Sequence, residues 1–351
     1  MADRNRTSLP LFHLEDLSHF DRCHLIVRFD HASKGGGDID LANRLRDEVI
    51  TQGISAEVTT PRKLKNVSPR DCLILFNLDR PFDAISALAK VPKETRCFLY
   101  TLHHPQAGVA KYLRHATGLR GKIAQLSGWA PEKYEALIDV AKGVRNGEPH
   151  RVLSALRHKE TVNKILARCH LLVVAEEELS EIELIHGPAP LGASILPHPP
   201  LCATKRADLP FRSVVVPGRI EPRKNQLAGL RALADAGVQE RGVKVIVVGG
   251  SGSDKNYFQR TINECKRTGC IYMSGLPKDN FFSLLSSASL VVNPSFFEVT
   301  SLVDLYVVER GIPLITTKHA YYNEAPLLNQ VDPNSWFENP AVIEAALDRL
   351  L

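Results

Sequence analysis

The fold follows from three short apolar runs, VVVPG (214–218), VKVIVVGG (243–250) and LVVNPS (290–295). They are rich in β-branched residues and end at Gly or Pro, which is typical of buried parallel strands. The segment NQLAGLRALADAG (225–237) lies between the first two, has apolar residues at helical spacing and ends at a glycine. This alternation predicts an α/β fold with doubly wound parallel sheets.

Two cations follow the first run, in GRIEPRKNQ (218–226). Ligands of doubly wound sheets bind at the carboxyl ends of the strands, where Arg219 and Lys224 are expected. Cations in that place bind a diphosphate and offset the charge of a departing nucleoside diphosphate. The alternative is that both are solvated charges at a helix start. Their position after Pro-Gly and before a helix favours phosphate binding.

A carboxylate follows the third run, in NPSFFEVTSLVDL (293–305). Glu298 comes just before an expected helix start, whose backbone N–H groups at Thr300, Ser301 and Leu302 form an anion site. Glu298 is therefore expected to accept hydrogen bonds from sugar hydroxyls while the N–H groups hold phosphate. An ordinary solvated loop carboxylate is the alternative.

The order and spacing of these motifs resemble the donor-binding half of GT-B glycosyltransferases of family 4, the glycosyl transferases group 1. In that family the loop reads Glu-Gly-x-Gly-Leu, and a second Glu follows eight positions after the first. Here Glu298 matches the first Glu, whereas Val299 and Ser301 replace the two glycines. Tyr306 stands at the place of the second Glu, and the downstream Gly-x-Pro spacing matches.

The resemblance implies two Rossmann-like domains facing a cleft, and transfer of a sugar from a nucleoside-diphosphate sugar. It implies that Leu276, in the turn SGLP (274–277), lies against the nucleotide base and that Tyr306 faces the donor ribose. A phenol makes fewer hydrogen bonds to ribose than a carboxylate does. We therefore expect weaker ribose discrimination, which would admit a dTDP-sugar as donor.

The first half has the same pattern, with a strand expected at HLIVRFD (24–30) and a helix at IDLANRLRDEVITQG (39–53). Gly35, Gly36 and Gly37 join them and let backbone approach a ligand closely. A dinucleotide-binding fold is disfavoured, because the G-x-G-x-x-G spacing is absent and the next strand lacks a following acidic residue. The resemblance places these glycines against the donor.

The segment Thr101-Leu102-His103-His104 ends another expected strand. It resembles the family's Thr-x-His segment, which places a histidine beside the transferred sugar, and His103 is the matching position. An imidazole donates to a sugar hydroxyl or exchanges a proton near neutral pH. A structural histidine that only packs in the core is the alternative.

Asp38 and Asp40 form a D-x-D pattern, which holds metal in the other major glycosyltransferase fold. Asp38 is instead expected at a helix N-cap, where a carboxylate needs no metal. It stays a minor candidate for the base of an inverting reaction.

Composition is that of an ordinary soluble protein, with 351 residues, 44% hydrophobic residues and a net charge of +5. The length suits two domains. The charge favours a phosphorylated substrate or an anionic surface but is too small to indicate nucleic acid, for which no motif is present. The seven scattered cysteines are expected to be buried free thiols, and neither zinc nor another metal site is expected.

The amino terminus lacks an apolar signal segment and no run is long enough to cross a membrane, so a cytoplasmic location is expected. The segment KYLRHATGLRGKIAQL (111–126) has apolar and basic faces. The resemblance implies a basic surface that reaches lipid-linked acceptors, so peripheral contact with the inner face of a membrane is one expectation. A solvated helix is the other.

The domain boundary is expected in LGASILPHPPLCATKRADLPFRS (191–213), which combines four prolines with a charge cluster. This gives an acceptor-side domain over 1–205 and a nucleotide-sugar-binding domain over 206–351. The family usually continues past the equivalent of residue 351 with a helix that returns to the first domain, so the chain is either without that helix or part of a longer protein.

The predicted function is transfer of a hexosyl or deoxyhexosyl group from a nucleoside-diphosphate sugar to a hydroxyl of a growing glycan or lipid-linked acceptor. The resemblance implies retention of anomeric configuration, no metal ion and no cofactor besides the donor. Two alternatives remain open: a nucleotide-sugar-binding protein that has lost catalysis, which Tyr306 and the missing loop glycines would suit, and a sugar-nucleotide epimerase.

Overall fold

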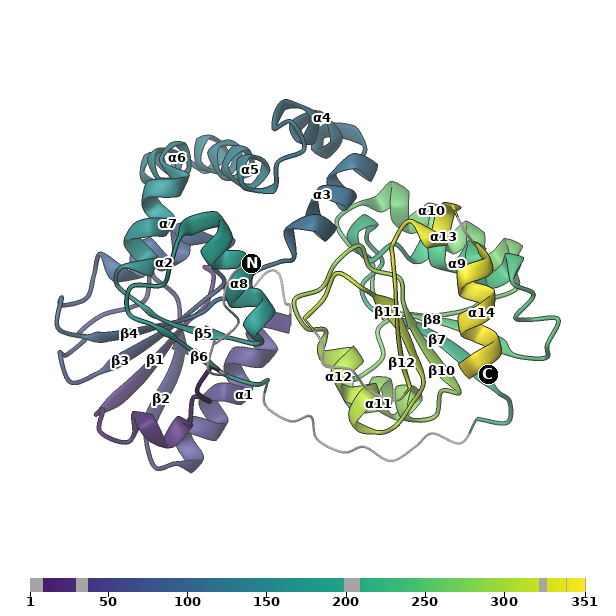
Figure 1. Ribbon diagram of the computed structural model, residues 1–351, viewed down its shortest axis with the longest axis horizontal. Coiled ribbons are helices and arrows are strands. Elements are labelled where there is room, and N and C mark those ends of the chain that lie inside the picture. The colour runs from purple at the N-terminus through teal and green to yellow at the C-terminus, as the bar shows by residue number, and fades with distance from the viewer. Residues whose placement is uncertain (1–8, 30–36, 199–208, 322–326, 339, 351) are drawn as a thin grey trace, which may run out of the picture. The chain divides into compact units, whose positions relative to one another are not determined.

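The computed structural model describes residues 9–29, 37–198, 209–321, 327–338 and 340–350 (Figure 1). The chain forms two compact units. The first comprises Met1–His103 and Thr117–Pro200, and the second comprises His104–Ala116 and Leu201–Leu351. Each unit has its own sheet and its own core.

The first unit contains a six-stranded parallel sheet in the order β2-β1-β3-β4-β5-β6. Its strands are β1 (Arg22–Ile26), β2 (Ser55–Thr59), β3 (Cys72–Phe76), β4 (Arg96–Tyr100), β5 (His170–Val173) and β6 (Ala193–Ile195). Every residue of β3 is buried, as expected for a central strand covered on both faces.

The helices of the first unit cover both faces of this sheet. The helical elements of this unit are η1 (Leu14–Leu17), α1 (Gly37–Thr51), α2 (Pro81–Leu88), α4 (Gly118–Leu126), α5 (Pro131–Asn146), α6 (Pro149–Leu156), α7 (His158–Leu166) and α8 (Glu176–His186). Of these, α5 packs against α4 and α6, and α6 packs against α2 and α7. Apolar residues of α2, α7 and α8 share one core with residues of β3, β4 and β5. Helix α1 packs instead against β1 and β2.

The second unit contains a six-stranded parallel sheet in the order β12-β11-β10-β7-β8-β9. Its strands are β7 (Ser213–Pro217), β8 (Lys244–Val248), β9 (Ile271–Met273), β10 (Leu290–Asn293), β11 (Leu314–Thr317) and β12 (Leu328–Val331). All residues of β7 are buried, so this strand lies in the middle of the core.

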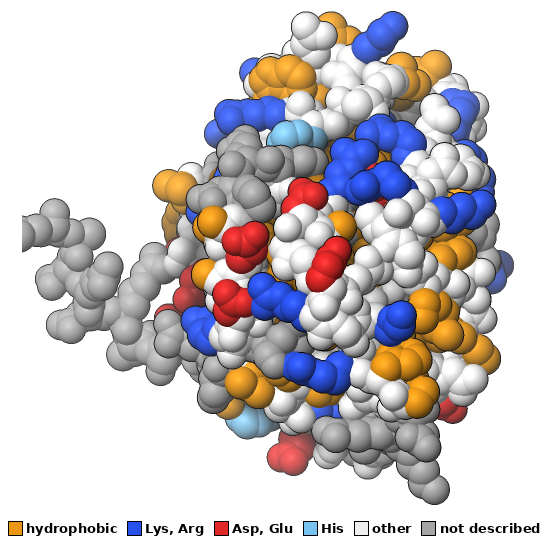
Figure 2. All heavy atoms as spheres, turned by 90° about the vertical axis from the view of Figure 1, so that its right-hand side faces the viewer, with side chains coloured by type: hydrophobic (Ala, Val, Ile, Leu, Met, Phe, Trp, Pro, Cys, Tyr) orange, Lys and Arg blue, Asp and Glu red, His pale blue; other side chains and the backbone are white. Residues whose placement is uncertain are grey.

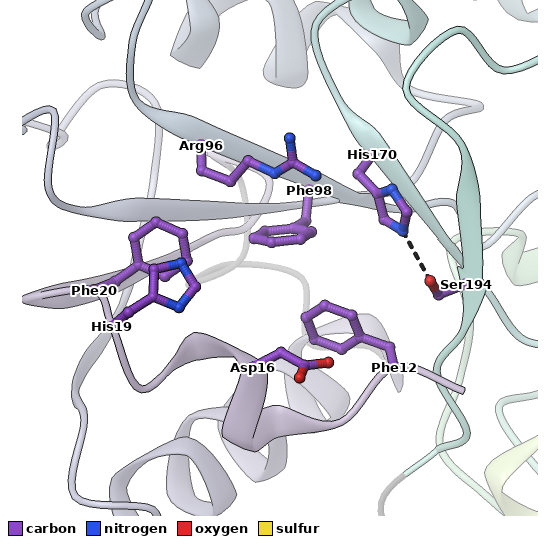
Figure 3. A pocket seen from close by; sticks show the side chains of 8 residues that line it. All are labelled: Phe12, Asp16, His19, Phe20, Arg96, Phe98, His170 and Ser194. Atoms are coloured by element: carbon purple, nitrogen blue, oxygen red, sulfur yellow. Dashed lines mark hydrogen bonds between the residues drawn. The ribbon is translucent and has the colours of Figure 1, made fainter. Parts of the chain in front are cut away.

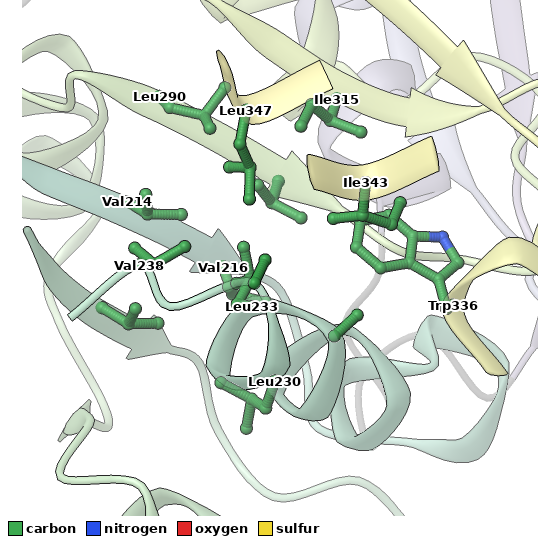
Figure 4. Close-up of a cluster of buried hydrophobic side chains, with 14 of the residues drawn as sticks. Val214, Val216, Leu230, Leu233, Val238, Leu290, Ile315, Trp336, Ile343 and Leu347 are labelled. Atoms are coloured by element: carbon green, nitrogen blue, oxygen red, sulfur yellow. The ribbon is translucent and has the colours of Figure 1, made fainter. Parts of the chain in front are cut away.

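Helices also cover both faces of the second sheet. The helical elements of this unit are α3 (Gln106–His115), η2 (Pro222–Lys224), α9 (Gln226–Asp235), α10 (Lys255–Arg267), α11 (Lys278–Ser286), α12 (Leu302–Glu309), α13 (Ser335–Glu338) and α14 (Pro340–Leu350). Val214 and Val216 point to a core with α9, α13 and α14, which Figure 4 shows. Val215 points to the other core, with α11 and α12, as the alternation of side chains along a strand requires.

The predicted alternation of strands and helices is confirmed in both units. The segment 111–126 is interrupted, because α3 ends at His115 and α4 begins at Gly118. Helix α3 lies within the range assigned from the sequence to the first domain, yet it packs with the second unit. The proposed boundary at 205 falls in 199–208, outside the described residues.

The surface in view in Figure 2 carries charges of both signs, and the described cysteines are free thiols. Figure 2 shows blue Lys and Arg side chains mixed with red Asp and Glu side chains on the face in view. Six cysteines of the described residues are free thiols, five of them buried, and Cys202 lies outside these residues. In the described part of the chain, no helix combines the length and apolar character needed to span a membrane.

Candidate active site

The loops after β7 and β8 cross at very close range. Gly218 N donates to Val248 O and Ile220 N donates to Gly250 O, each at 2.9 Å. A Cβ at Gly249 would lie 2.1 Å from the carbonyl oxygen of Gly218, and Gly249 has φ +154°, so only glycine fits there. This backbone pairing of the two loops fixes the chain where the cationic segment begins.

Three cations follow in this segment. Arg219 lies in the loop after β7, with its side chain 48% exposed and 3.8 Å from Glu221. Arg223 and Lys224 end the short 3-10 helix η2, where Asn225 then adopts a left-handed conformation and starts α9. The site therefore presents one solvent-accessible guanidinium and two partly buried cations.

Glu298 is the centre of the cation cluster. Its side chain is buried and accepts hydrogen bonds from Lys224 Nζ, from Arg223 Nη1 at 3.3 Å and from Ser295 Oγ at 2.6 Å. Burial alone would raise the pKa of Glu298, but Lys224 and Arg223 outweigh it and lower the pKa to about 2. Glu298 is thus a carboxylate at neutral pH, and its burial among Arg223, Lys224 and Ser295 contradicts the predicted alternative of a solvated loop residue.

The cluster is nearly balanced in charge without a ligand. Arg219, Arg223 and Lys224 face Glu221 and Glu298, so three cations and two anions leave one net positive charge. A diphosphate that reached Lys224 would compete with Glu298 for the ammonium group. Its binding would release the carboxylate for other donors, such as sugar hydroxyls.

Helix α12 begins as predicted at Leu302, with Ser301 as N-cap. The Ser301 hydroxyl accepts from Asp304 N at 3.3 Å, and Thr300 Oγ1 donates to the carbonyl oxygen of Tyr321. Asp304 lies in the first turn and is buried, and its carboxylate accepts hydrogen bonds from Asn293 Nδ2 at 2.9 Å and from Thr316 Oγ1 at 2.7 Å. Its negative charge opposes a second anion at the start of this helix. We therefore expect Arg219, more than α12, to attract a phosphate.

The remaining expected donor contacts are placed as follows. Leu276 lies half-buried between β9 and α11, beside the core of the second unit. Gly37 is the first residue of α1, in the first unit, whereas Gly35 and Gly36 lie outside the described residues. Asp38 is in the first turn of α1 and not at an N-cap, and it forms an ion pair with Arg28 at 3.0 Å.

The expectation that Tyr306 faces the donor ribose is wrong. Its side chain is fully buried in the core, where the ring packs 4.5 Å from Phe282 and the guanidinium of Arg310 lies 3.7 Å from the ring centroid. The phenol pairs with Ser286 Oγ at 2.7 Å and donates to the carbonyl oxygen of Phe282 at 3.2 Å. An aromatic ring gains from burial once its hydroxyl has partners, so the argument for a deoxyribose donor loses its basis.

Helix α3 packs directly on the loop that carries Glu298. A Cβ at Gly108 would lie 2.6 Å from Phe297 Cβ and 2.8 Å from Phe296 O. His115 stacks on Phe296 with ring centroids 5.1 Å apart, and Arg223 lies over the Phe297 ring at 5.4 Å. The loop is therefore held between α3 and the cation cluster.

An ion-pair network secures the other side of α3. Lys111 Nζ donates to Asp332 Oδ1 at 2.6 Å, and Lys318 Nζ lies 2.7 Å from the same carboxylate. Burial would raise the pKa of Asp332, but the hydrogen bonds from both lysines hold it well below its usual range. Helix α3 is thus anchored to the strand ends of the second unit by charge as well as by packing.

His103 occupies a separate place, after β4 in the first unit. It is buried; its Nδ1 lies 2.6 Å from Asp79 Oδ1, and its backbone N–H donates to Glu178 Oε1 at 2.7 Å. Burial alone would lower the pKa of His103, but Asp79 and Glu178 raise it to about 9. The raised pKa favours the imidazolium form of the ring at neutral pH, which donates hydrogen bonds.

The stability of the protein should depend on the charge of His103. Because its folded pKa is above the ordinary 6.5, this stabilisation is complete below pH 6.5 and is lost as the pH rises through about 9. We expect a loss on the order of 3 kcal/mol across this window. Urea unfolding of the wild type and His103→Gln between pH 6 and 10 measures it, and an identical pH dependence in both would contradict the assignment.

Sequence reasoning missed several residues of these clusters. Arg223 is the cation next to Lys224 in GRIEPRKNQ, and its position alone does not distinguish it from a solvated charge. Ser295 ends the strand run that was quoted, but a serine alone carried no signal. Asp79 and Glu178 meet His103 from positions 24 and 75 residues away, which no local pattern indicates.

Comparison with known proteins agrees with this geometry. Residues 212–351 match the family model of the glycosyl transferases group 1. Sucrose-phosphate synthase from Thermosynechococcus elongatus is similar in structure, with a TM-score of 0.61 and 13% identity over 94% of this chain and 89% of that one. HepE from Anabaena, in complex with UDP, is similar in structure with a TM-score of 0.57. Its sequence identity is 14%, over 94% of this chain and 90% of that one.

A UDP-forming α,α-trehalose-phosphate synthase from Burkholderia xenovorans, in complex with glucose-6-phosphate, is also similar. Its TM-score is 0.54 at 11% identity, over 91% of this chain and 72% of that one. No curated protein matches the chain in sequence. The chain therefore has the GT-B fold, and its residues 212–351 are similar to the glycosyl transferases group 1.

Proposed function

We propose that the chain transfers a sugar from a nucleoside-diphosphate sugar, with UDP as the first nucleotide to test, to a hydroxyl of a sugar or glycan. The observation that carries this proposal is the pairing of Arg223 and Lys224 with Glu298, with Arg219 beside Glu221, at the carboxyl ends of β7 and β10. The choice of UDP is supported by a similar structure that contains it and by another similar protein that is UDP-forming.

Each residue of the cluster has a role in this proposal. Arg219 and Lys224 bind the diphosphate, helped by the backbone at Thr300–Leu302, and stabilise the charge that grows as the sugar C1–O bond breaks. Once the diphosphate has taken the place of Glu298 at the Lys224 ammonium group, the Glu298 carboxylate accepts hydrogen bonds from the donor sugar. Since these cations supply the charge stabilisation, we propose a metal-independent reaction.

The bond changes follow from the same roles. The electron pair of the broken C1–O bond goes to the departing β-phosphate oxygen, and the acceptor oxygen forms the new bond to C1. We propose retention of configuration, in which the acceptor proton passes to that phosphate oxygen on the same face of the sugar. His103, held as a cation, donates a hydrogen bond to the sugar and removes no proton.

The acceptor is proposed to be a glycan, and a more specific form of the proposal is that this glycan is lipid-linked. Leu119 and Leu126 lie one above the other on α4 and are 74% and 80% exposed, beside the exposed Arg120 and Lys122. An apolar stripe flanked by cations suits an anionic membrane surface. Transfer to an acceptor carried in anionic liposomes, compared with a soluble acceptor, tests this alternative.

The test of the function is nucleotide release from a panel of UDP-, GDP-, dTDP- and CMP-sugars, with and without mixed oligosaccharide acceptors. We expect acceptor-dependent release of UDP that persists in EDTA and yields a product of unchanged anomeric configuration by NMR. Arg219→Ala should abolish release, whereas Arg260→Ala, on the exposed side of α10, should not. Nucleotide binding without release, or conversion of the donor to an epimer without acceptor, would refute glycosyl transfer.

A further inference from the structure

A cavity of about 560 Å³ lies in the first unit. It lies between η1, the turn after it, and strands β4, β5 and β6. Figure 3 shows its lining side chains, which are Phe12, Asp16, His19, Phe20, Arg96, Phe98, His170 and Ser194. Its volume is within the range typical of small-ligand sites, about 300–1,000 Å³.

The cavity is on one particular face and edge of the first sheet. Cys97 and Leu99 of β4 point into the core with α2, α7 and α8, so Phe98 points to the opposite face. Arg96 is the first residue of β4, whereas His103 follows its last. At roughly 3.3 Å per residue, β4 separates the cavity from the carboxyl edge by roughly 13 Å. This is therefore a second site and not part of the one that contains His103.

Aromatic rings form the apolar part of the cavity. Phe12 and Phe98 meet edge to face with centroids 5.2 Å apart, and His19 lies 4.0 Å from Phe20. The ring of Phe98 also lies 6.0 Å from His170. Rings that hold one another in place provide flat apolar surfaces whose position costs a ligand little to organise.

Two opposite charges line the same cavity without pairing. Asp16 and Arg96 form no ion pair with each other, nor with any other side chain among the described residues. One Asp16 oxygen accepts from His13 N at 3.2 Å, and the guanidinium of Arg96 lies 5.5 Å from the Phe98 ring. Both side chains are exposed and keep hydrogen-bonding capacity that a ligand in the cavity can use.

A third polar group is held rigidly. His170 Nδ1 donates to the carbonyl oxygen of Leu191 at 2.9 Å, and its Nε2 lies 2.9 Å from Ser194 Oγ. With the proton on Nδ1, Nε2 accepts from the Ser194 hydroxyl, as Figure 3 shows by a dashed line between the two. The Ser194 oxygen then keeps lone pairs that accept a hydrogen bond from a ligand.

These observations select a class of ligand. An apolar molecule would strip water from Asp16 and Arg96 without replacing it, which is costly. A phosphate would gain from Arg96 but be repelled by Asp16. A sugar ring has an apolar face that packs on aromatic rings, no net charge, and hydroxyls that both donate to Asp16 and accept from Arg96.

We propose that this cavity binds a neutral saccharide unit, and that it holds a remote part of the glycan that the enzyme extends. Binding itself is independent of catalysis, whereas the role in holding an acceptor rests on the proposed function. A long acceptor gains affinity when two of its parts bind at once, because the second contact is intramolecular.

The test uses an array of neutral and anionic oligosaccharides and the full chain. The double variant Asp16→Asn, Arg96→Ala should lose neutral-glycan binding at least tenfold; the new amide still accepts from His13 N, so η1 stays capped. Arg22→Ala is the matched control, since Arg22 is also an exposed first residue of a strand in the same sheet. It should bind as the wild type does, and so should the donor-site variant Lys224→Ala.

The outcomes separate this site from the donor site. If the wild type responds to UDP but binds no neutral glycan, or if the double variant binds glycans normally, the saccharide site is overturned while the proposed function stands. Binding restricted to anionic glycans would also overturn it. If glycans bind through this cavity but no nucleotide sugar is used, the cavity stands and the proposed function fails.

Discussion

Replacing Lys224 by alanine is expected to abolish the UDP-dependent rise in melting temperature and to lower the free energy of unfolding by about 2 kcal/mol. Lys224 is bonded to Glu298, which is only 7% exposed. Removal of one partner from a buried pair commonly costs ~3–5 kcal/mol. The expected loss is smaller because Arg223 and Ser295 still donate to the carboxylate. Urea unfolding with and without UDP measures both effects.

A second substitution separates stability from binding. In Lys224→Ala, Glu298→Gln, the amide needs no cation, so most of the lost stability should return while the response to UDP stays absent. Lys244→Ala is the matched control, because Lys244 is exposed at the start of β8. A full UDP response in Lys224→Ala would remove the ammonium from the phosphate site. A double variant no more stable than the single one would show that an unpaired carboxylate is not the cause.

Acid unfolding is an independent test of the ion pair between Lys224 and Glu298. The folded pKa of Glu298, about 2, lies below its ordinary value of 4.5. The stabilisation is therefore present above pH 4.5 and is lost as the pH falls towards 2. Without Lys224 the pKa of Glu298 is less depressed, so the Lys224→Ala variant should begin to lose stability at a higher pH than the wild type.

Local sequence patterns were sufficient for the strands and for the centre of the site. Runs such as VVVPG (214–218) fix a parallel strand and its carboxyl end through their β-branched residues and the turn that follows. Since parallel strands end at one edge of a sheet, Lys224 and Glu298 are each expected at that edge. Their direct pairing, across 74 residues of sequence, is a finding of the structure.

The face of a helix on which a residue lies is harder to predict from the sequence. The spacing from Glu298 predicts that Tyr306 lies on the ligand side of α12. In the structure, Tyr306 lies on the side of α12 that faces the core. The deciding contacts come from Phe282 and Ser286 on α11, a different helix. A period of 3.6 residues relates positions to each other but does not say which face a partner will cover.

Membership of a unit is also decided by contacts at long range. Helix α3 follows a strand of the first sheet in the chain, and its amphipathic pattern is that of any surface helix. Its place in the second unit depends on Gly108, whose missing side chain lets the helix touch Phe297, and on the pairing of Lys111 with Asp332. No local feature of residues 104–116 indicates these partners.

The same close approach leads to the second large effect, expected for Gly108→Ala. The new Cβ would lie 2.6 Å from Phe297 Cβ, whereas carbon atoms normally pack about 3.5–4.0 Å apart, so the loop before Glu298 must move by roughly 1 Å. Overpacking of this kind costs about 1–3 kcal/mol, against about 1 kcal/mol gained from the better helix propensity of alanine. We expect a net loss of about 1 kcal/mol in stability and a fall of about 100-fold in kcat/KM, since a displacement of this size is enough to misplace a reacting group.

The neighbouring position supplies the control for Gly108→Ala. Ala107 is exposed on the same helix, so Ala107→Gly loses about 1 kcal/mol of helix propensity without touching the loop. The two variants should therefore have similar stability but differ in turnover, because only Gly108→Ala displaces Glu298. Equal turnover in the two would mean that the contact of α3 with Phe297 does not position the carboxylate. In that case Lys224, Arg223 and Ser295 alone would hold Glu298 in place.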